Sequence, residues 1–238
     1  MFSDFDGTLT DGSYITSKLF EVIKLCEKNR LPLIIVSGRS LSWGHFFLSH
    51  LPLSMVVMEG GGIVVHKNQN NQFDEYPLLT LVEIDRLKEI TLKLKTHFKN
   101  VPLSKDSYGR LTDQAIELDL INKNPTLKKE ILDFFQKEKV NYSASNVHIN
   151  FWIGTVSKAK GVEFVLSNFY KNILTKECLF FGDAPNDESM FNYFENSVGV
   201  SNIEPFLKNI KTKPKIILEG ENNQGINGVL SFLEKSCK

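Results

Sequence analysis

Short β-like runs that alternate with helical stretches constrain the fold of this chain most strongly. The runs at residues 1–5, 32–36, 54–58 and 178–181 are mostly apolar, and each is followed by a turn rich in Gly, Ser or Asp. A strand that is apolar along its whole length is typically buried on both faces, as in a parallel sheet between helices. The pattern therefore predicts an α/β fold with a Rossmann-like parallel sheet and helices on both faces.

A segment with a different order of helices and strands interrupts this pattern. Its order is a helix at residues 81–98, a strand at 116–120, a second helix at 126–139 and a strand at 147–151. Such an order indicates an α+β module rather than a continuation of the parallel sheet. We therefore expect a core domain of residues 1–77 and 156–238 and an inserted α+β domain of residues 78–155.

The charge balance excludes some classes of partner. Lys and Arg together number 28, as do Asp and Glu, so no global basic field would attract nucleic acid or an anionic membrane. The apolar runs are much shorter than the roughly 20 residues that span a bilayer, and the acidic N-terminal sequence does not resemble a signal peptide. We expect a cytoplasmic protein that works as a monomer or a homodimer.

Two acidic motifs follow predicted strands. Asp4 and Asp6 end the first strand, and Asp183 and Asp187 follow the strand at residues 178–181. Taken alone, the first pair is as easily explained as a turn, and Asp187 as a helix cap. Because parallel strands place ligands at their carboxyl ends, the four carboxylates together indicate a site for a hard cation, for which Mg²⁺ is suited.

Further polar residues could complete a site for an oxyanion. Ser37, Gly38 and Arg39 end the second strand and offer a hydroxyl and turn amides, although a simple strand-to-helix turn would explain them too. Lys158 begins the helix after the inserted domain and could bring a positive charge. A lone lysine would carry no such prediction, so this one depends on the order of the motifs.

In this order, the four motifs resemble those of the haloacid dehalogenase superfamily of phosphohydrolases. Residues 4–8, Asp-Phe-Asp-Gly-Thr, match the first motif, Ser37 the second, Lys158 the third, and residues 182–187, Gly-Asp-Ala-Pro-Asn-Asp, the fourth. The resemblance covers nearly the whole chain. The insert lies between the second and third motifs, as in the large-cap subfamily IIB of Cof-like, sucrose-phosphate, trehalose-phosphate and mannosyl-phosphoglycerate phosphatases.

Two departures from the family pattern deserve mention. The pair Lys160-Gly161 also resembles the third motif, but aligning Lys158 places Ala159 at the small position and apolar residues after it, so we favour Lys158. The first strand is short, because only three residues precede Asp4. We expect the natural start to lie a few residues upstream.

The resemblance implies a magnesium-dependent phosphatase that hydrolyses a small phosphorylated metabolite, a sugar phosphate, through an aspartyl-phosphate. It implies Asp4 as nucleophile and Asp6 as general acid and base. Mg²⁺ would be held by the Asp4 and Asp183 carboxylates and the Asp6 carbonyl, with Asp187 in the same acidic group. The transferring oxygens would be bound by Ser37, Lys158 and the turn at Gly38 and Arg39. Asn186 and Asp187 would orient Lys158 or metal-bound water.

The resemblance also implies that the insert is a cap that selects the substrate. Arg110, Asn146, His148 and Asn150 lie in its polar segments beside predicted strands and are candidates for contacting the substrate. A solvated hairpin with an ordinary histidine is the alternative explanation for them.

Two other functions fit the same motifs. A phosphomutase would use the same aspartyl-phosphate but yield an isomeric sugar phosphate instead of free phosphate. A non-catalytic sugar-phosphate-binding protein could share the scaffold, but such a protein would have no need to keep Asp4, Asp6, Asp183 and Asp187 close together.

Overall fold

The larger of two sheets forms the centre of the molecule. The computed structural model describes residues 1–117, 121–144 and 148–236. The sheet has eight strands in the order β11-β10-β9-β1-β2-β3-β4-β5. The six strands from β11 to β3 are parallel, as predicted: Ile216–Ile217, Asn196–Gly199, Leu179–Gly182, Phe2–Ser3, Ile34–Val36 and Met55–Met58.

The other two strands form an antiparallel edge that the sequence analysis did not predict. After β3, the chain reverses at Gly60 and Gly61, which both have positive φ, and returns as β4 (Ile63–Lys67) and β5 (Phe73–Pro77). The turn-forming glycines were visible in the sequence, but the strands after them alternate too irregularly to show their pairing.

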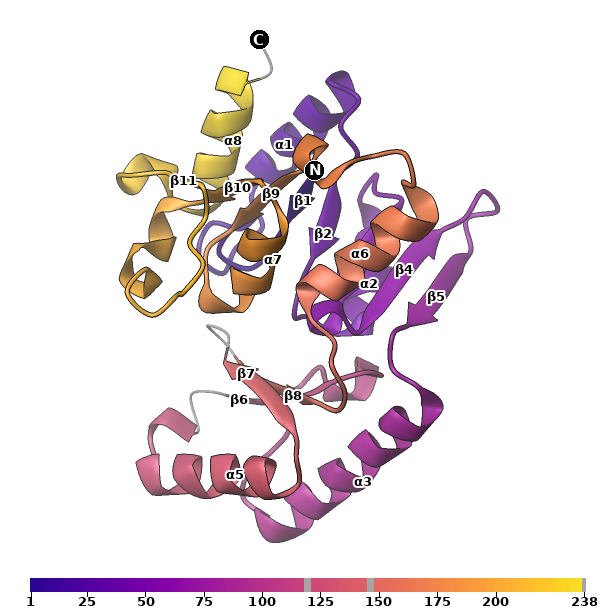
Figure 1. Cartoon of the computed structure of the whole chain (residues 1–238), viewed down its shortest axis with the longest axis vertical. Helices are drawn as coiled ribbons and strands as arrows, with labels where there is room; N and C mark the ends of the chain where they lie inside the picture. The colour runs from indigo at the N-terminus through magenta and orange to yellow at the C-terminus, as the bar shows by residue number, and fades with distance from the viewer. Residues whose placement is uncertain (118–120, 145–147, 237–238) are drawn as a thin grey trace.

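Helices cover both faces of this sheet, as expected (Figure 1). On one face the buried cluster includes side chains of α1 (Ser17–Lys28), α2 (Leu41–His50) and α8 (Gly225–Ser236). On the other it includes side chains of α6 (Lys158–Phe169) and α7 (Glu188–Tyr193). The α/β prediction is confirmed, because successive strand residues such as Ile34 and Ile35 alternate between the two clusters.

The inserted segment, residues 78–155, contains the second sheet. Its strands are antiparallel in the order β6-β8-β7, with bounds Gln114–Glu117, His148–Trp152 and Asn141–Ala144. Figure 1 shows α3 (Leu81–His97) and α5 (Pro125–Lys137) on the side of this sheet away from the larger one. Ile149 and Phe151 pack with these helices, so strand alternation turns Asn150 and Trp152 toward the larger sheet. The exact limits of a cap domain stay a prediction.

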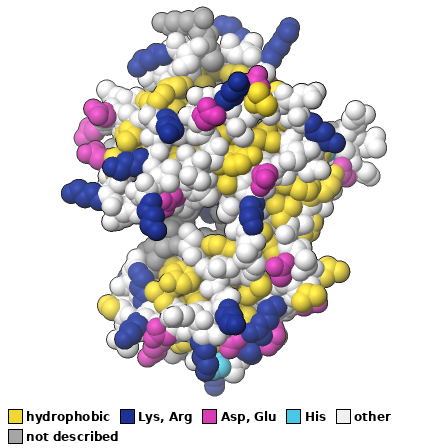
Figure 2. All heavy atoms as spheres, viewed as in Figure 1, with side chains coloured by type: hydrophobic (Ala, Val, Ile, Leu, Met, Phe, Trp, Pro, Cys, Tyr) yellow, Lys and Arg dark blue, Asp and Glu magenta, His cyan; other side chains and the backbone are white. Residues whose placement is uncertain are grey.

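Short 3₁₀ helices connect these elements. They are η1 (Glu59–Gly61), η2 (Ser107–Gly109), η3 (Thr175–Glu177), η4 (Pro185–Asp187), η5 (Ser201–Phe206) and η6 (Glu221–Asn223). A hollow between the two lobes is visible in the space-filling view of Figure 2.

The start of α6 is held very close to the turn after β3. A Cβ atom on Gly61 would lie 2.0 Å from the carbonyl oxygen of Ser157, and Gly61 also has a φ of +99°. A Cβ atom on Gly161, one turn into α6, would lie 2.5 Å from Val57. These two glycines therefore let the helix approach the sheet closely enough to set the position of its first residue, Lys158.

This packing predicts different effects for two neighbouring substitutions. Gly60 also has positive φ, but a Cβ atom there meets nothing within 4 Å. Gly60→Ala should lower the free energy of unfolding by about 1–2 kcal/mol, the cost of left-handed backbone. Gly61→Ala should cost roughly 1–3 kcal/mol more, because the methyl group overlaps the Ser157 backbone. Urea unfolding of both variants measures the difference, and equal losses would contradict the close approach.

Candidate active site

Three carboxylates meet at the carboxyl end of the parallel sheet. Asp4 follows β1 and Asp183 follows β9, and these strands are adjacent and parallel. The Asp4 amide continues the ladder by donating to the Phe181 carbonyl at 2.9 Å. Asp187 lies in η4, one turn after Asp183. One oxygen from each of Asp4, Asp183 and Asp187 lies within 4.8 Å of the others, and all three residues are buried.

Lys158 lies between two of these carboxylates. Its Nζ donates to Asp4 Oδ1 at 2.6 Å and to Asp187 Oδ1 at 2.7 Å. Burial by itself would lower the pKa of Lys158, but Asp187 and Asp4 outweigh burial and raise that pKa. Lys160 instead reaches the hydroxyl of Thr155 at the surface. Of the two lysines that the third motif offered, Lys158 is thus the one beside the acidic cluster.

Neighbouring groups hold Asp183 and Asp187 in place. Thr8 and Asn202 donate to Asp183 at 3.2 and 2.7 Å, and Asp187 accepts the amides of Asp183 and Ala184. Sequence reasoning missed Asn202. A signal was available, because Asn202 closely follows β10, a parallel strand that ends at the same edge of the sheet.

The electrostatics of the cluster favour a bound cation. Burial raises the pKa of Asp183 well above its ordinary value, and Asp4 and Asp187 raise it further. Burial also raises the pKa of Asp4, to about 7, against the opposing effect of Lys158. Three buried carboxylates beside a single ammonium form a donor set of hard oxygens, which fits a hard divalent cation.

Ser37, Gly38 and Arg39 follow β2, the strand adjacent to β1, and Ser37 and Arg39 bind each other. Ser37 is buried at the end of β2, and its Oγ accepts the amide of Arg39 at 3.1 Å. The Arg39 guanidinium binds both carboxylate oxygens of Asp6, with contacts of 2.6 and 2.9 Å, and stacks on Trp43 at 4.6 Å. The Asp6 carboxylate therefore lies outside the acidic cluster.

The candidates from the inserted segment have different surroundings. The Arg110 side chain is completely buried, and it binds Asp106 at 2.9 Å and Asp113 at 2.7 Å. His148 lies 3.5 Å from Glu117, and burial lowers the pKa of this imidazole. Asn150 faces the larger lobe. Asn146 lies outside the described residues.

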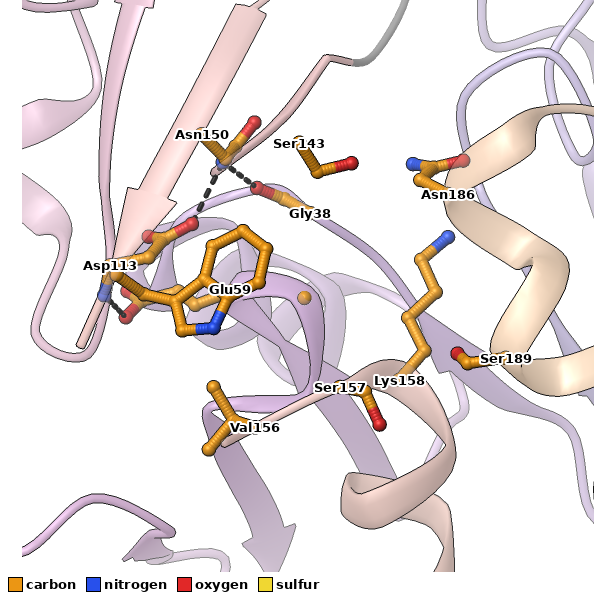
Figure 3. Close-up of a pocket in the computed structure, with 12 residues that line it drawn as sticks. Gly38, Glu59, Asp113, Ser143, Asn150, Val156, Ser157, Lys158, Asn186 and Ser189 are labelled. Atoms are coloured by element: carbon orange, nitrogen blue, oxygen red, sulfur yellow. Dashed lines mark hydrogen bonds between the residues drawn. The ribbon is translucent and has the colours of Figure 1, made fainter. Parts of the chain in front are cut away.

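A cavity of about 110 Å³ separates the lobes beside Lys158 (Figure 3). The residues lining it include Lys158, Asn186 and Ser189 from the larger lobe and Ser143, Asn150 and Trp152 from the insert. Lys158, Asn150 and Asn186, which were predicted from distant parts of the sequence, thus share one cavity. The side-chain oxygen of Asn186 is buried and has no hydrogen-bond partner in the described structure.

Glu59 is a second residue that sequence reasoning missed. Its buried carboxylate accepts the amides of Leu111 and Thr112, the Thr112 hydroxyl and the amide of Leu41, at 2.6 to 3.1 Å. It therefore fixes a loop of the insert to the larger lobe. No sequence signal could have shown this, because the partners in the insert lie more than fifty residues away and donate mostly through the backbone.

Comparison with known proteins agrees with this site. The family model described as haloacid dehalogenase-like hydrolase matches residues 1–109 and 80–233. The chain belongs to this family. The membership predicted from the four motifs is confirmed, and the chain is an enzyme of the hydrolase class.

Relatives match this hydrolase over almost its full length. A phosphoglycolate phosphatase of Methanobrevibacter smithii is 27% identical and covers 98% of this chain and 95% of its own. One of Sulfurisphaera tokodaii is also 27% identical, with 99% and 92% covered. A solved structure of a subclass IIB sugar phosphatase of the superfamily shares the fold, with a TM-score of 0.68, 14% identity and 98% of both chains covered. Among the described helices, none is long and apolar enough to cross a membrane.

The carboxylate cluster predicts how stability depends on pH and metal. When the pKa of a carboxyl group is higher in the folded than in the unfolded protein, ionising that group destabilises the folded state. Stability therefore falls as pH rises from 3.8 through the folded pKa, which is about 7 for Asp4. Asp183→Asn should therefore raise the melting temperature of the metal-free protein at about pH 8 and much less at about pH 5. A divalent cation should stabilise the parent protein at the higher pH but not this variant.

Asp133→Asn, at an exposed position of α5, provides the control for thermal melts at both pH values. Equal stabilisation of parent protein and Asp183→Asn by the cation would exclude Asp183 as a ligand.

Proposed function

We propose that this hydrolase is a magnesium-dependent phosphatase that hydrolyses a small phosphorylated metabolite through an aspartyl-phosphate on Asp4. The observation that carries the proposal is the contact of Lys158 with both Asp4 and Asp187, next to Asp183. A buried ammonium that bridges two carboxylates at the edge of a cavity holds a nucleophile in one orientation and can also attract phosphate.

Asp4 would attack phosphorus with the oxygen that Lys158 does not bind. The bond from phosphorus to the alcohol oxygen breaks as the bond to Asp4 forms, and Lys158 and Ser37 would stabilise the charge on the transferring oxygens. Water then attacks the aspartyl-phosphate, which releases phosphate and restores the Asp4 carboxylate. Bound Mg²⁺ would neutralise charge so that the two anions can approach each other, with the Asp4 and Asp183 carboxylates and the Asp6 carbonyl as proposed ligands beside Asp187.

Asp6 would give a proton to the leaving alcohol and then take one from water. Its carboxylate is held by Arg39 through both oxygens, so both are already engaged by protein before a leaving alcohol arrives. The proton-donor role therefore requires that the Arg39 contact loosens when the substrate enters, and the released guanidinium would then be available to the phosphate.

A sugar phosphate is our first choice of substrate. The cavity offers neutral polar side chains, Ser143, Asn150, Asn186 and Ser189, together with the face of Trp152. Hydroxyl groups pair well with such side chains, and sugar rings stack on aromatic faces. Phosphoglycolate is the second candidate. Two relatives that match over nearly the full length are named phosphoglycolate phosphatase, and the cavity is small, as a small substrate requires.

The nucleophile is tested by Asp4→Asn. The amide cannot form an aspartyl-phosphate, so turnover should fall by at least about three orders of magnitude, a loss that is common when a catalytic nucleophile is removed. Mass spectrometry of the trapped phosphoenzyme, or of a beryllium fluoride adduct, should find the added group on Asp4 in the parent protein only. Asp133→Asn serves as the matched control, and substantial activity of Asp4→Asn would remove Asp4 from this role.

The substrate and reaction type are tested by a panel of phosphate esters with Mg²⁺. Free phosphate should appear with sugar phosphates, and excess chelator should abolish its release until Mg²⁺ is restored. Conversion to an isomeric sugar phosphate without phosphate release would identify a phosphomutase instead. Binding without any product would identify a non-catalytic protein, and preference for phosphoglycolate would favour the second candidate.

A further inference from the structure

The loop that carries Ser37 is held partly by the larger lobe and partly by the inserted segment. The Ser37 carbonyl accepts the amide of Gly60 at 3.0 Å, and the Arg39 carbonyl accepts the amide of Glu59 at 3.0 Å. Both donors belong to the turn after β3. The two outer carbonyls of the loop are therefore fixed by the backbone of the larger lobe itself.

The middle carbonyl has different partners. The Gly38 oxygen accepts a hydrogen bond from Arg110 Nη1 at 3.1 Å and one from Asn150 Nδ2 at 3.1 Å. Both of its side-chain donors in the described part of the chain come from the insert, 72 and 112 residues away. Figure 3 shows the Asn150 contact from β8 down to the loop.

Asp113 holds the two donors together. Its Oδ1 accepts from Arg110 at 2.7 Å and its Oδ2 from Asn150 at 2.7 Å, so both side chains are oriented before they reach the loop. Asp106 binds Arg110 from its other side at 2.9 Å. The Asp113 backbone is fixed in turn, because Glu59 accepts the amides of residues 111 to 113.

A carbonyl and the following amide belong to one planar peptide and point in opposite directions. The peptide between Gly38 and Arg39 directs its oxygen toward the insert and its N–H toward Ser37 Oγ, at 3.1 Å. A Cβ atom on Gly38 would meet nothing within 4 Å, so there is open space beside the backbone here. The hydrogen bonds that hold this peptide in the described structure are the one to Ser37 Oγ and the two from the insert.

We propose that Asn150 and Arg110, oriented by Asp113, are positioning residues that fix the Gly38–Arg39 peptide and thereby align Ser37 for phosphate. The proposal rests on the proposed function of this site. It gives Arg110 a role other than contact with the leaving group, because its guanidinium is already occupied by protein partners. Docking of the insert would then be required for phosphate binding as well as for selection of the leaving group.

The test uses Asn150→Leu, which removes the donor and keeps the approximate size. Loss of one such hydrogen bond should reduce kcat by about three- to tenfold for both the preferred metabolite and p-nitrophenyl phosphate. Affinity for inorganic phosphate with Mg²⁺ should fall by a similar factor in calorimetry. Asn150→Ser is the second variant, in case the apolar side chain disturbs folding.

Asn141→Leu is the matched control. Asn141 also lies in the insert sheet and donates to a glycine carbonyl, that of Gly154 at 2.6 Å, but it does not contact the loop. It should leave kcat and phosphate affinity unchanged. An equal loss in the control would assign the effect to the stability of the insert and overturn the proposal.

Hydrogen exchange at the Arg39 amide tests the same contact without any substrate. Exchange should be faster in Asn150→Leu and Asn150→Ser than in the parent protein and Asn141→Leu, because the peptide then loses one of its two hydrogen bonds from the insert. Unchanged exchange and unchanged phosphate affinity would overturn the proposal. A loss of kcat confined to the preferred metabolite would also overturn the proposal, since Asn150 would then contact the leaving group. Because this readout needs no turnover, an inactive parent protein would contradict the proposed function and leave the test of positioning intact.

Discussion

The buried ammonium of Lys158 between Asp4 and Asp187 is the interaction on which the rest of the site depends. Three carboxylates in one buried cluster repel each other, and burial adds a desolvation penalty for each charge. Lys158 offsets part of both effects, and a divalent cation would offset more. The carboxylates can be buried together because the ends of strands, the start of α6 and the turns bring hydrogen-bond donors to them in fixed positions.

Close backbone packing makes this interaction possible. Lys158 is the first residue of α6, and the start of this helix rests directly on Gly61. A larger residue at Gly61 would push the helix outward and draw the ammonium away from Asp4. The geometry of the charges thus depends on two uncharged positions, Gly61 and Gly161, whose role is to leave room.

A network of polar contacts joins the two lobes, beside the apolar packing of Leu111 against the core of the larger lobe. Glu59 from the larger lobe and Arg110, Asp113 and Asn150 from the insert exchange hydrogen bonds largely with backbone groups. Buried polar groups of this kind are costly when unpaired and directional when paired, so they define one docking geometry. Apolar attraction alone is non-directional, so it would specify the docking geometry less closely.

The sequence by itself determined the parallel sheet, the order of the motifs and the identity of Asp4 and Asp183 as neighbours. These follow from local patterns, because a strand end is a short-range feature and parallel strands bring their carboxyl ends to one edge. Lys158 was predicted only from the place of its motif in that order. The sequence analysis did not find the antiparallel edge of β4 and β5, or strand β7, since short strands without regular alternation have little periodicity.

Only the tertiary structure decided which polar groups are already paired. Arg39 and Arg110 were candidates for binding substrate, but in the fold they contact Asp6 and the pair Asp106 and Asp113. The role of Glu59 emerged only from the fold, in which backbone amides of a distant segment donate to its carboxylate. The physical reason is that charge pairing depends on distances of a few ångströms between residues far apart in the chain. Composition and motif spacing do not determine those distances.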